Sequence, residues 1–238
     1  TGNTISGSGN SASKSLMLAD ILRDERSDVG NVLWVVSDVS EIGITKKAFN
    51  IWGNLPVFVY QRRPDDEALT FPTIREFNQI KRLELLEFVS RLITYKKAVF
   101  VVDFLSLLQN FPDPEDVSRR ALKLSVGTRL EVVDLVETLV SLGYEMSDNE
   151  VLSKGQYFKR GDSLFIYPIN SENVFRVDFE FDMVDRISAL EDGDYSKTTK
   201  SFKEIAIFPL DYENETQNFL GLMGKNAVVI DDEVDVVD

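Results

Sequence analysis

The chain has 238 residues, of which 43% are hydrophobic and 11% aromatic, enough for one large domain or two small ones with their own cores. It contains no cysteine and no histidine, which excludes disulfides, thiolate nucleophiles, Cys/His zinc sites and imidazole bases. Its 40 acidic residues outnumber 26 basic residues, so the formal net charge is −14. Because affinity for DNA depends largely on Lys and Arg at phosphates, we expect little direct DNA binding and a protein partner instead.

No segment of the sequence predicts a membrane span or a signal peptide. Apolar runs stay well short of the ~18 residues that a span requires, and residues 1–6 lack the basic and apolar parts of a signal peptide. We therefore expect a cytoplasmic protein without membrane contact. The missing initiator methionine is typical of a fragment of a longer chain.

The first half of the chain alternates helical and strand patterns. Leu18, Ile21 and Leu22, for example, have the spacing of one apolar helix face. The expected helices cover residues 15–22, 41–52 and 74–94, with a further helix starting at 104–108, and the expected strands cover 32–36, 56–60 and 98–102. Strands that alternate with helices predict a parallel sheet with crossover helices.

The pattern changes after residues 111–114, Phe-Pro-Asp-Pro, which we expect to break regular structure. An amphipathic helix at 132–142 is then surrounded by short strands, which is typical of an α+β subdomain. The strands are expected at residues 122–126, 156–158, 163–167, 174–179 and 205–208. A helix at 219–223 and a strand at 227–230 return to the α/β pattern.

Residues 8–15 occupy the place of a G-x-x-x-x-G-K-[ST] phosphate loop before a helix. Lys14 and Ser15 are retained, but Ser8 and Ser13 replace both glycines. A serine at positive φ costs about 1 kcal/mol or more and crowds the phosphates. We interpret the segment as a vestigial nucleotide loop or as a polar loop that caps the helix through Ser13 or Ser15.

Residues 228–233 have the form of a Walker B segment, a strand that ends in Asp232 and Glu233. Together with the altered loop, they predict the fold class, an α/β parallel-sheet, degenerate P-loop (helicase-like) domain with an inserted α+β subdomain. The acidic residues 65–67 are expected in a solvated loop without a catalytic role. We therefore expect no enzyme activity and no cofactor. In the alternative, Lys14 binds ATP phosphates while Ser15 and Asp232 bind Mg²⁺.

Residues 155–168, GQYFKRGDSLFIYP, form the most informative motif of the chain. They resemble the G-x-F-x-x-R-G signature of the UvrA-interaction domain that the excinuclease protein UvrB shares with the bacterial transcription-repair coupling factor. Residues 174–187 resemble the next part of that domain, and residues 124–127 and 142–144 resemble its start. The resemblance implies a degenerate P-loop, UvrB-like domain at 1–121, a UvrA-interaction-like domain at 122–208 and a return to the first domain at 209–238.

The altered phosphate loop distinguishes the two families. UvrB has an intact loop and a tyrosine-rich hairpin that grips DNA, whereas residues 60–73 here hold no tyrosine cluster. The chain therefore resembles the N-terminal, UvrB-like region of the coupling factor. The resemblance implies a non-catalytic module that recruits UvrA to stalled transcription sites, with RNA polymerase-binding and translocase domains elsewhere in the parent chain. The alternative is an ATP-binding fragment of a UvrB-like DNA repair enzyme.

The resemblance also implies which residues contact UvrA. The arginines of the family fall on Arg160 and Arg176, and Phe179 or Phe181 is expected to be the apolar anchor. An arginine presents a fork of donors that suits a carboxylate.

The sequence departs from the family pattern beside each arginine. Asp162 follows the Arg-Gly pair where the family usually has a small or apolar residue, and the order Glu180-Phe181 is unusual. An alternative interpretation is that the two arginines only pair with Asp162 and Asp178 at the surface.

Overall fold

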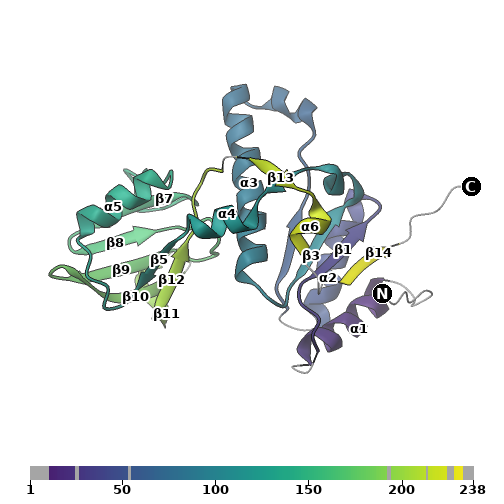
Figure 1. Ribbon diagram of the computed structural model, residues 1–238, viewed down its shortest axis with the longest axis horizontal. Helices are drawn as coiled ribbons and strands as arrows, with labels where there is room; N and C mark the ends of the chain where they lie inside the picture. The colour runs from purple at the N-terminus through teal and green to yellow at the C-terminus, as the bar shows by residue number, and fades with distance from the viewer. Residues whose placement is uncertain are drawn as a thin grey trace, which may run out of the picture. The chain divides into compact units, whose positions relative to one another are not determined.

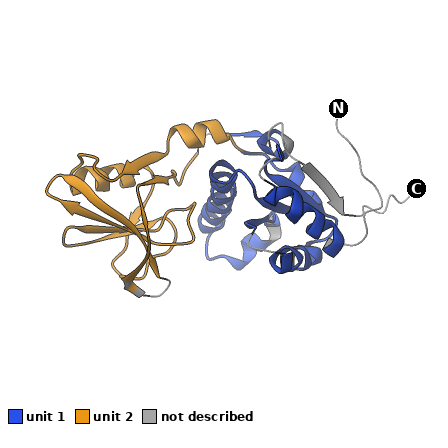
Figure 2. Ribbon diagram, turned by 90° about the horizontal axis from the view of Figure 1, so that it is seen from below, with its two compact units in different colours: residues 1–111, 215–238 blue, residues 112–214 orange. Residues whose placement is uncertain are grey.

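The computed structural model describes residues 11–24, 27–52, 55–191, 194–212, 214–223 and 228–232. The chain divides into two compact units, of which unit 1 comprises residues 1–111 and 215–238 and unit 2 comprises residues 112–214 (Figure 2). The sequence predicts these divisions at residues 122 and 209. None of the helices in the described ranges combines the length and apolar character that a membrane crossing requires.

Unit 1 is built on a four-stranded parallel sheet in the order β14-β1-β3-β2 (Figure 1). The strands are β1 (Val32–Val36), β2 (Val57–Tyr60), β3 (Val99–Asp103) and β14 (Val228–Asp232). Every residue of β1 and β3 is buried, as expected for the centre of a parallel sheet that is covered on both faces. The four strands and the parallel sheet that the sequence predicts are confirmed, with small shifts at the strand ends.

Helices cover both faces of this sheet. They are α1 (Ser11–Arg23), α2 (Val39–Trp52), α3 (Ile74–Thr94) and α6 (Phe219–Met223), with the 3-10 helices η1 (Asp65–Thr70) and η2 (Phe104–Leu108). On one face, Phe49 of α2 meets Trp34 of β1 edge to face at 5.2 Å. On the other, Phe88 of α3 lies 5.3 Å from Phe100 of β3 and 5.5 Å from Phe219 of α6. Residues 104–108, expected to start an α-helix, form a 3-10 helix instead.

Unit 2 is built on a six-stranded sheet in the order β11-β10-β9-β8-β7-β6. Its strands are β6 (Glu145–Met146), β7 (Gln156–Arg160), β8 (Ser163–Ile166), β9 (Phe175–Glu180), β10 (Met183–Glu191) and β11 (Asp194–Phe202). Neighbouring strands are antiparallel except β6 and β7. A separate antiparallel pair consists of β5 (Leu122–Ser125) and β12 (Glu204–Ile207), and the helices are α4 (Pro114–Arg119) and α5 (Val132–Ser141).

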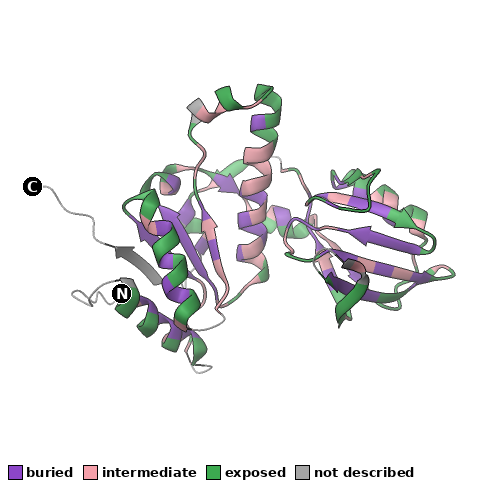
Figure 3. Ribbon diagram, turned by 180° about the vertical axis from the view of Figure 1, so that it is seen from behind, coloured by how far each residue is buried: buried purple, intermediate pink, exposed green. Residues whose placement is uncertain are grey.

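The main core of unit 2 lies on one face of the six-stranded sheet, which we call the inner face. There Leu164 and Val177 of the sheet pack with Leu135 and Leu139 of α5 and with Ile205 of β12. All five side chains are buried, and Figure 3 shows the buried stretches of these elements in purple. Because successive residues of a strand point to opposite faces, the residues between them lie on the other, outer face.

Tight turns at two glycines hold the end of unit 2 in place. Gly143 and Gly155 have φ of +89° and +86°, in the left-handed region that favours glycine. Leu210 lies against both, and its amide donates to the carbonyl of Leu142 at 2.7 Å. The buried hydroxyl of Tyr144 donates to the carbonyl of Phe208 at 3.0 Å. Burial raises the pKa of this phenol well above its ordinary value.

This part of the chain also has features that the sequence pattern does not predict. Residues 111–114 do not only break regular structure, because β4 (Phe111–Pro112) pairs with β13 (Glu215–Gln217). Pro114 then begins α4, a position where the missing backbone N–H of a proline is tolerated. Asp113 caps the helix, because its side chain accepts a hydrogen bond from the backbone N–H of Glu115. The sequence pattern also fails to predict β6, β10 and β11, and the polar residues of β11 give no apolar alternation.

Candidate functional site

The strand β9 places its polar residues on the outer face of the sheet. Phe175, Val177 and Phe179 are buried and belong to the core of the inner face, whereas Arg176 and Asp178 alternate with them and are partly exposed. This period of two follows from the pleat of a strand. The alternation therefore places Arg176 and Asp178 outside the core.

Strand register brings polar residues of four strands into one row on the outer face. Arg160 of β7 is paired with Ser163 of β8, Ser163 with Asp178 of β9, and Asp178 with Arg186 of β10. Arg176 lies one pleat further along β9 on the same face. We call Arg160, Arg176 and Arg186, together with Ser163 and Asp178, the arginine face.

Asp178 is the centre of this group. Its Oδ1 accepts from the hydroxyl of Ser163 at 2.6 Å and from Nε of Arg176 at 2.6 Å, and its Oδ2 lies 3.6 Å from Nε of Arg186. The side chain of Asp178 is 14% exposed, while those of Arg176 and Arg186 are 36% and 61% exposed. The carboxylate therefore lies under two guanidinium groups that face solvent.

Arg160 is the most exposed of the three arginines, at 70%, and its Nη1 lies 3.6 Å from Glu150. Glu150 also lines a hollow of about 260 Å³ whose walls include Leu152, Leu190 and Tyr195. A surface pair of this kind contributes little to stability, about 0–1 kcal/mol. Arg160 can therefore exchange Glu150 for another carboxylate at low cost.

Aromatic rings support the arginine face on the same side of the sheet. Phe158 and Phe165 stack at 4.4 Å with an interplanar angle of 6°, and the ring of Tyr195 continues the stack at 6.2 Å. The guanidinium of Arg176 lies 5.8 Å from the centre of the Phe165 ring, within the range of a cation–π contact. Arg176 is thus held between a ring and a carboxylate.

The two phenylalanines expected as apolar anchors lie in opposite environments. Phe179 is 8% exposed and packs in the core of the inner face, so its assignment as a contact residue is wrong. Phe181 is 93% exposed in the two-residue loop that joins β9 to β10, where its φ is +57°. Arg129 donates to the neighbouring Asp182 at 2.6 Å and lowers the pKa of that carboxyl group. The loop therefore presents the Phe181 ring to solvent.

The surface pairing that the sequence offers as an alternative is found for one arginine. Arg176 pairs with Asp178 as that interpretation expects. Arg160 instead lies next to Glu150, from the loop before β7, and the backbone carbonyl of Asp162 accepts from the amide of Phe179 at 3.0 Å. Pairing with Asp178 leaves the guanidinium of Arg176 partly exposed, so it does not bury the arginine.

The expected nucleotide residues are only partly described by the structure. Lys14 and Ser15 lie in the first turns of α1, while residues 8–10 lie outside the described residues. Ser15 is buried, and its hydroxyl donates to the carbonyl of Ala12 at 2.8 Å. Ser15 therefore lies inside the helix, so its interpretation as a cap is wrong. This hydroxyl is engaged within the helix, which disfavours the Mg²⁺ role of the alternative.

The expected Walker B residues lie at the limit of the described chain. Asp232 is the last residue of β14 and is paired in register with Val36 of β1. The placement of its side chain is not described, and Glu233 lies outside the described residues.

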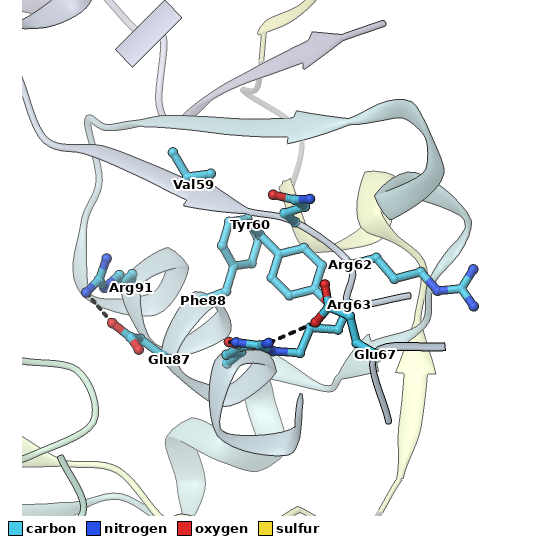
Figure 4. Close-up of a pocket in the computed structure, with 10 residues that line it drawn as sticks. Val59, Tyr60, Arg62, Arg63, Glu67, Glu87, Phe88 and Arg91 are labelled. Carbon is cyan, nitrogen blue, oxygen red and sulfur yellow. Dashed lines mark hydrogen bonds and ion pairs between the residues drawn. The ribbon is translucent and has the colours of Figure 1, made fainter. Parts of the chain in front are cut away.

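Unit 1 contains a polar pocket of about 320 Å³ beside the end of β2 (Figure 4). The rings of Tyr60 and Phe88 form part of its wall. Arg63 binds Glu84 through Nε and Nη2 at 2.6–3.0 Å and donates to Glu67 at 3.0 Å. These contacts hold η1 against α3, so Glu67 is not in the solvated loop that the sequence predicts. We assign them a structural role.

Comparison with known proteins identifies the part of the chain that carries the arginine face. Residues 122–212 match the UvrB interaction domain. UvrABC system protein B of Thermotoga neapolitana is 36% identical over 115 residues, which cover 48% of this chain and 17% of the relative. The transcription-repair-coupling factor of Borreliella burgdorferi is 27% identical over 117 residues, which cover 48% of this chain and 10% of the relative. That of Haemophilus influenzae is 30% identical over 148 residues, which cover 61% of this chain and 12% of the relative.

The UvrB interaction domain match confirms the resemblance that the motif at residues 155–168 carries. Homologues of the chain are UvrB proteins and transcription-repair-coupling factors, as the resemblance predicts. The matched part of the chain spans less than a fifth of the length of these three relatives. The arginine face lies wholly within the matched residues.

Sequence reasoning missed Arg186 and the central position of Asp178. Arg186 directly precedes the core residue Ile187, which places it on the opposite face once β10 is known to be a strand. The pairing with Asp178 depends on strand register, which the sequence does not reveal.

Proposed function

We propose that this chain is a non-catalytic interaction module of transcription-coupled nucleotide excision repair, which recruits UvrA to stalled transcription sites. Its UvrB and coupling-factor homologues support a role in nucleotide excision repair. The observation that carries the proposal is the coincidence of the UvrB interaction domain match with a solvent-facing group of arginines.

Arg160 and Arg176 are the proposed UvrA contacts. Their guanidinium groups are partly exposed, and both lie on the outer face of one sheet, which fixes their spacing. Arginine is favoured at interfaces because its planar fork binds a carboxylate with two hydrogen bonds. Phe181 is the proposed apolar anchor, since its exposed ring has nearly all its surface left to bury.

The proposal includes neither catalysis nor a cofactor. Ser8 and Ser13 replace the phosphate-loop glycines, and the hydroxyl of Ser15 is bound to the backbone of α1. We propose that the parent chain is a coupling factor, whose RNA polymerase-binding and translocase domains supply ATP-driven movement. The net charge of −14 supports recruitment of a protein rather than of DNA.

A binding titration of the 238-residue chain against purified UvrA tests this function. We expect a complex that forms equally well with and without Mg-ATP and that Arg176→Glu abolishes. Arg119→Glu is a matched control, because Arg119 lies on α4 of the same unit and is 78% exposed outside the arginine face. Equal binding by Arg176→Glu and the unaltered chain would overturn the site assignment.

A further inference from the structure

The geometry of the arginine face points to a residue and a role that neither the motif nor the comparisons assign. Three guanidinium groups lie on this face, where Asp178 is shared by Arg176 and Arg186 and Glu150 lies 3.6 Å from Arg160. Arg186 is 61% exposed and lies at the far end of the row from Arg160. Arg186 therefore lies on the strand next to the one that carries the proposed UvrA contact Arg176.

Asp178 contacts two of the arginine side chains, Arg176 through a hydrogen bond at 2.6 Å and Arg186 as an ion pair at 3.6 Å. Two short hydrogen bonds, from Ser163 and Arg176, hold a carboxylate that is largely withdrawn from solvent. Both Arg176 and Arg186 approach it with Nε. The guanidinium of Arg176, held by Nε, keeps its two terminal nitrogens for another acceptor, and the ion pair favours conformers of Arg186 that lie close to the same carboxylate.

We propose that Arg186 is a third arginine that contacts the partner and that Asp178 is a positioning residue that aims Arg176 and Arg186 at carboxylates of that partner. This inference rests on the proposed function and deepens it. The partner surface is an acidic protein patch with at least two carboxylates, one to bind Arg160 and one to bind Arg186, the two ends of the arginine face. Side chains oriented before binding lose less entropy when they bind, which raises affinity.

The chemistry favours carboxylates of a protein over phosphates of a nucleic acid. Glu150 lies beside Arg160, and Glu180 and Asp185 are exposed on the strands that carry Arg176 and Arg186. A continuous polyphosphate chain has to run past all of these acids, whereas isolated carboxylates of a protein can bind at the arginines alone. The planar forks also match a carboxylate in shape.

Replacing Asp178 tests the proposal, because two explanations of its role predict opposite changes in affinity for the partner. If Asp178 only neutralises the face, its replacement by Asn makes the face more positive and tightens binding to an acidic partner. If Asp178 positions the arginines, Asp178→Asn weakens binding despite the gain in positive charge. Ser163→Ala changes no charge but removes one of the two hydrogen bonds that hold Asp178, so it also weakens binding.

The experiment titrates UvrA with the 238-residue chain carrying Arg186→Gln, Asp178→Asn, Ser163→Ala or the control Arg119→Gln. Thermal unfolding of each variant is measured to verify that the variant is folded. We expect Arg186→Gln to weaken binding about tenfold, Asp178→Asn at least about threefold, and Arg119→Gln to have no effect. A parallel titration with duplex DNA at moderate salt tests the other class of acceptor.

Each outcome bears on the inference separately from the proposed function. If Arg176→Glu abolishes binding but Arg186→Gln binds as the unaltered chain does, the third contact is wrong and the proposed function stands. Tighter binding by Asp178→Asn overturns the positioning role. Binding to duplex DNA that depends on Arg186 overturns the choice of a protein carboxylate. A chain that fails to bind UvrA at all overturns both proposals.

Discussion

Phe181 offers a test that separates backbone strain from partner contact. Its φ of +57° is unfavourable for a residue with a Cβ by about 1–2 kcal/mol. Glycine relieves this strain but adds about 0.5–1 kcal/mol of conformational entropy to the unfolded chain. Since the ring is 93% exposed, its removal costs almost no buried area. We therefore expect Phe181→Gly to raise the free energy of unfolding by about 0.5–1 kcal/mol, while UvrA binding weakens roughly ten- to hundredfold because a buried phenylalanine contributes about 1.5–3 kcal/mol.

Phe181→Ala is the matched control, because alanine loses the ring and keeps the Cβ. Its stability in urea unfolding should equal that of the unaltered chain, and its UvrA affinity should be as low as that of Phe181→Gly. If Phe181→Gly is no more stable than Phe181→Ala, the strain argument fails. If both variants bind UvrA with unaltered affinity, Phe181 is not the anchor.

Three further predictions concern the fold and the nucleotide loop. Gly155→Ala combines a positive φ with a Cβ only 2.7 Å from the side chain of Leu210, so it should lower the free energy of unfolding by about 2–3 kcal/mol. Gly161→Ala, where the space is open, should lower it by only about 1–2 kcal/mol. Equal thermal midpoints of the two variants would contradict this. Because burial raises the pKa of Tyr144 above its ordinary value of 10.0, its contribution to stability is present below pH 10 and is lost as the pH rises further. The unfolding free energy of the unaltered chain should therefore fall more steeply above pH 10 than that of Tyr144→Phe, and parallel curves would refute the burial argument. Mg-ATP should leave the unfolding midpoint unchanged, whereas an increase that Lys14→Ala abolishes would favour the nucleotide-binding alternative.

The α/β part of the fold could be predicted from sequence because its signals are local. The apolar runs at residues 32–36 and 98–102 have the length and composition of buried strands, and the first is bounded by turn residues. The apolar residues at 74–94 recur with the spacing of one helix face. Strand β11 was missed because it lies at the sheet edge, where an exposed strand carries few apolar residues.

The candidate site was predicted only as far as motif and alternation allow. The resemblance located Arg160 and Arg176, and the alternation on β9 places Arg176 outside the core. Phe179 was misassigned because Phe179 and Phe181 are two residues apart and would lie on the same face of a continuous strand. Their environments differ only because β9 ends at Glu180 and Phe181 lies in the turn that follows. Arg186 was missed because its proximity to Asp178 depends on the register between β9 and β10.

Competition between this chain and UvrB for UvrA tests the central claim most directly. If the chain uses a UvrB interaction domain for recruitment, both proteins should occupy the same surface of UvrA. We expect unlabelled UvrB to displace a fluorescently labelled 238-residue chain from UvrA completely. A stable ternary complex of the chain, UvrA and UvrB, or no complex of the chain with UvrA, would contradict the account.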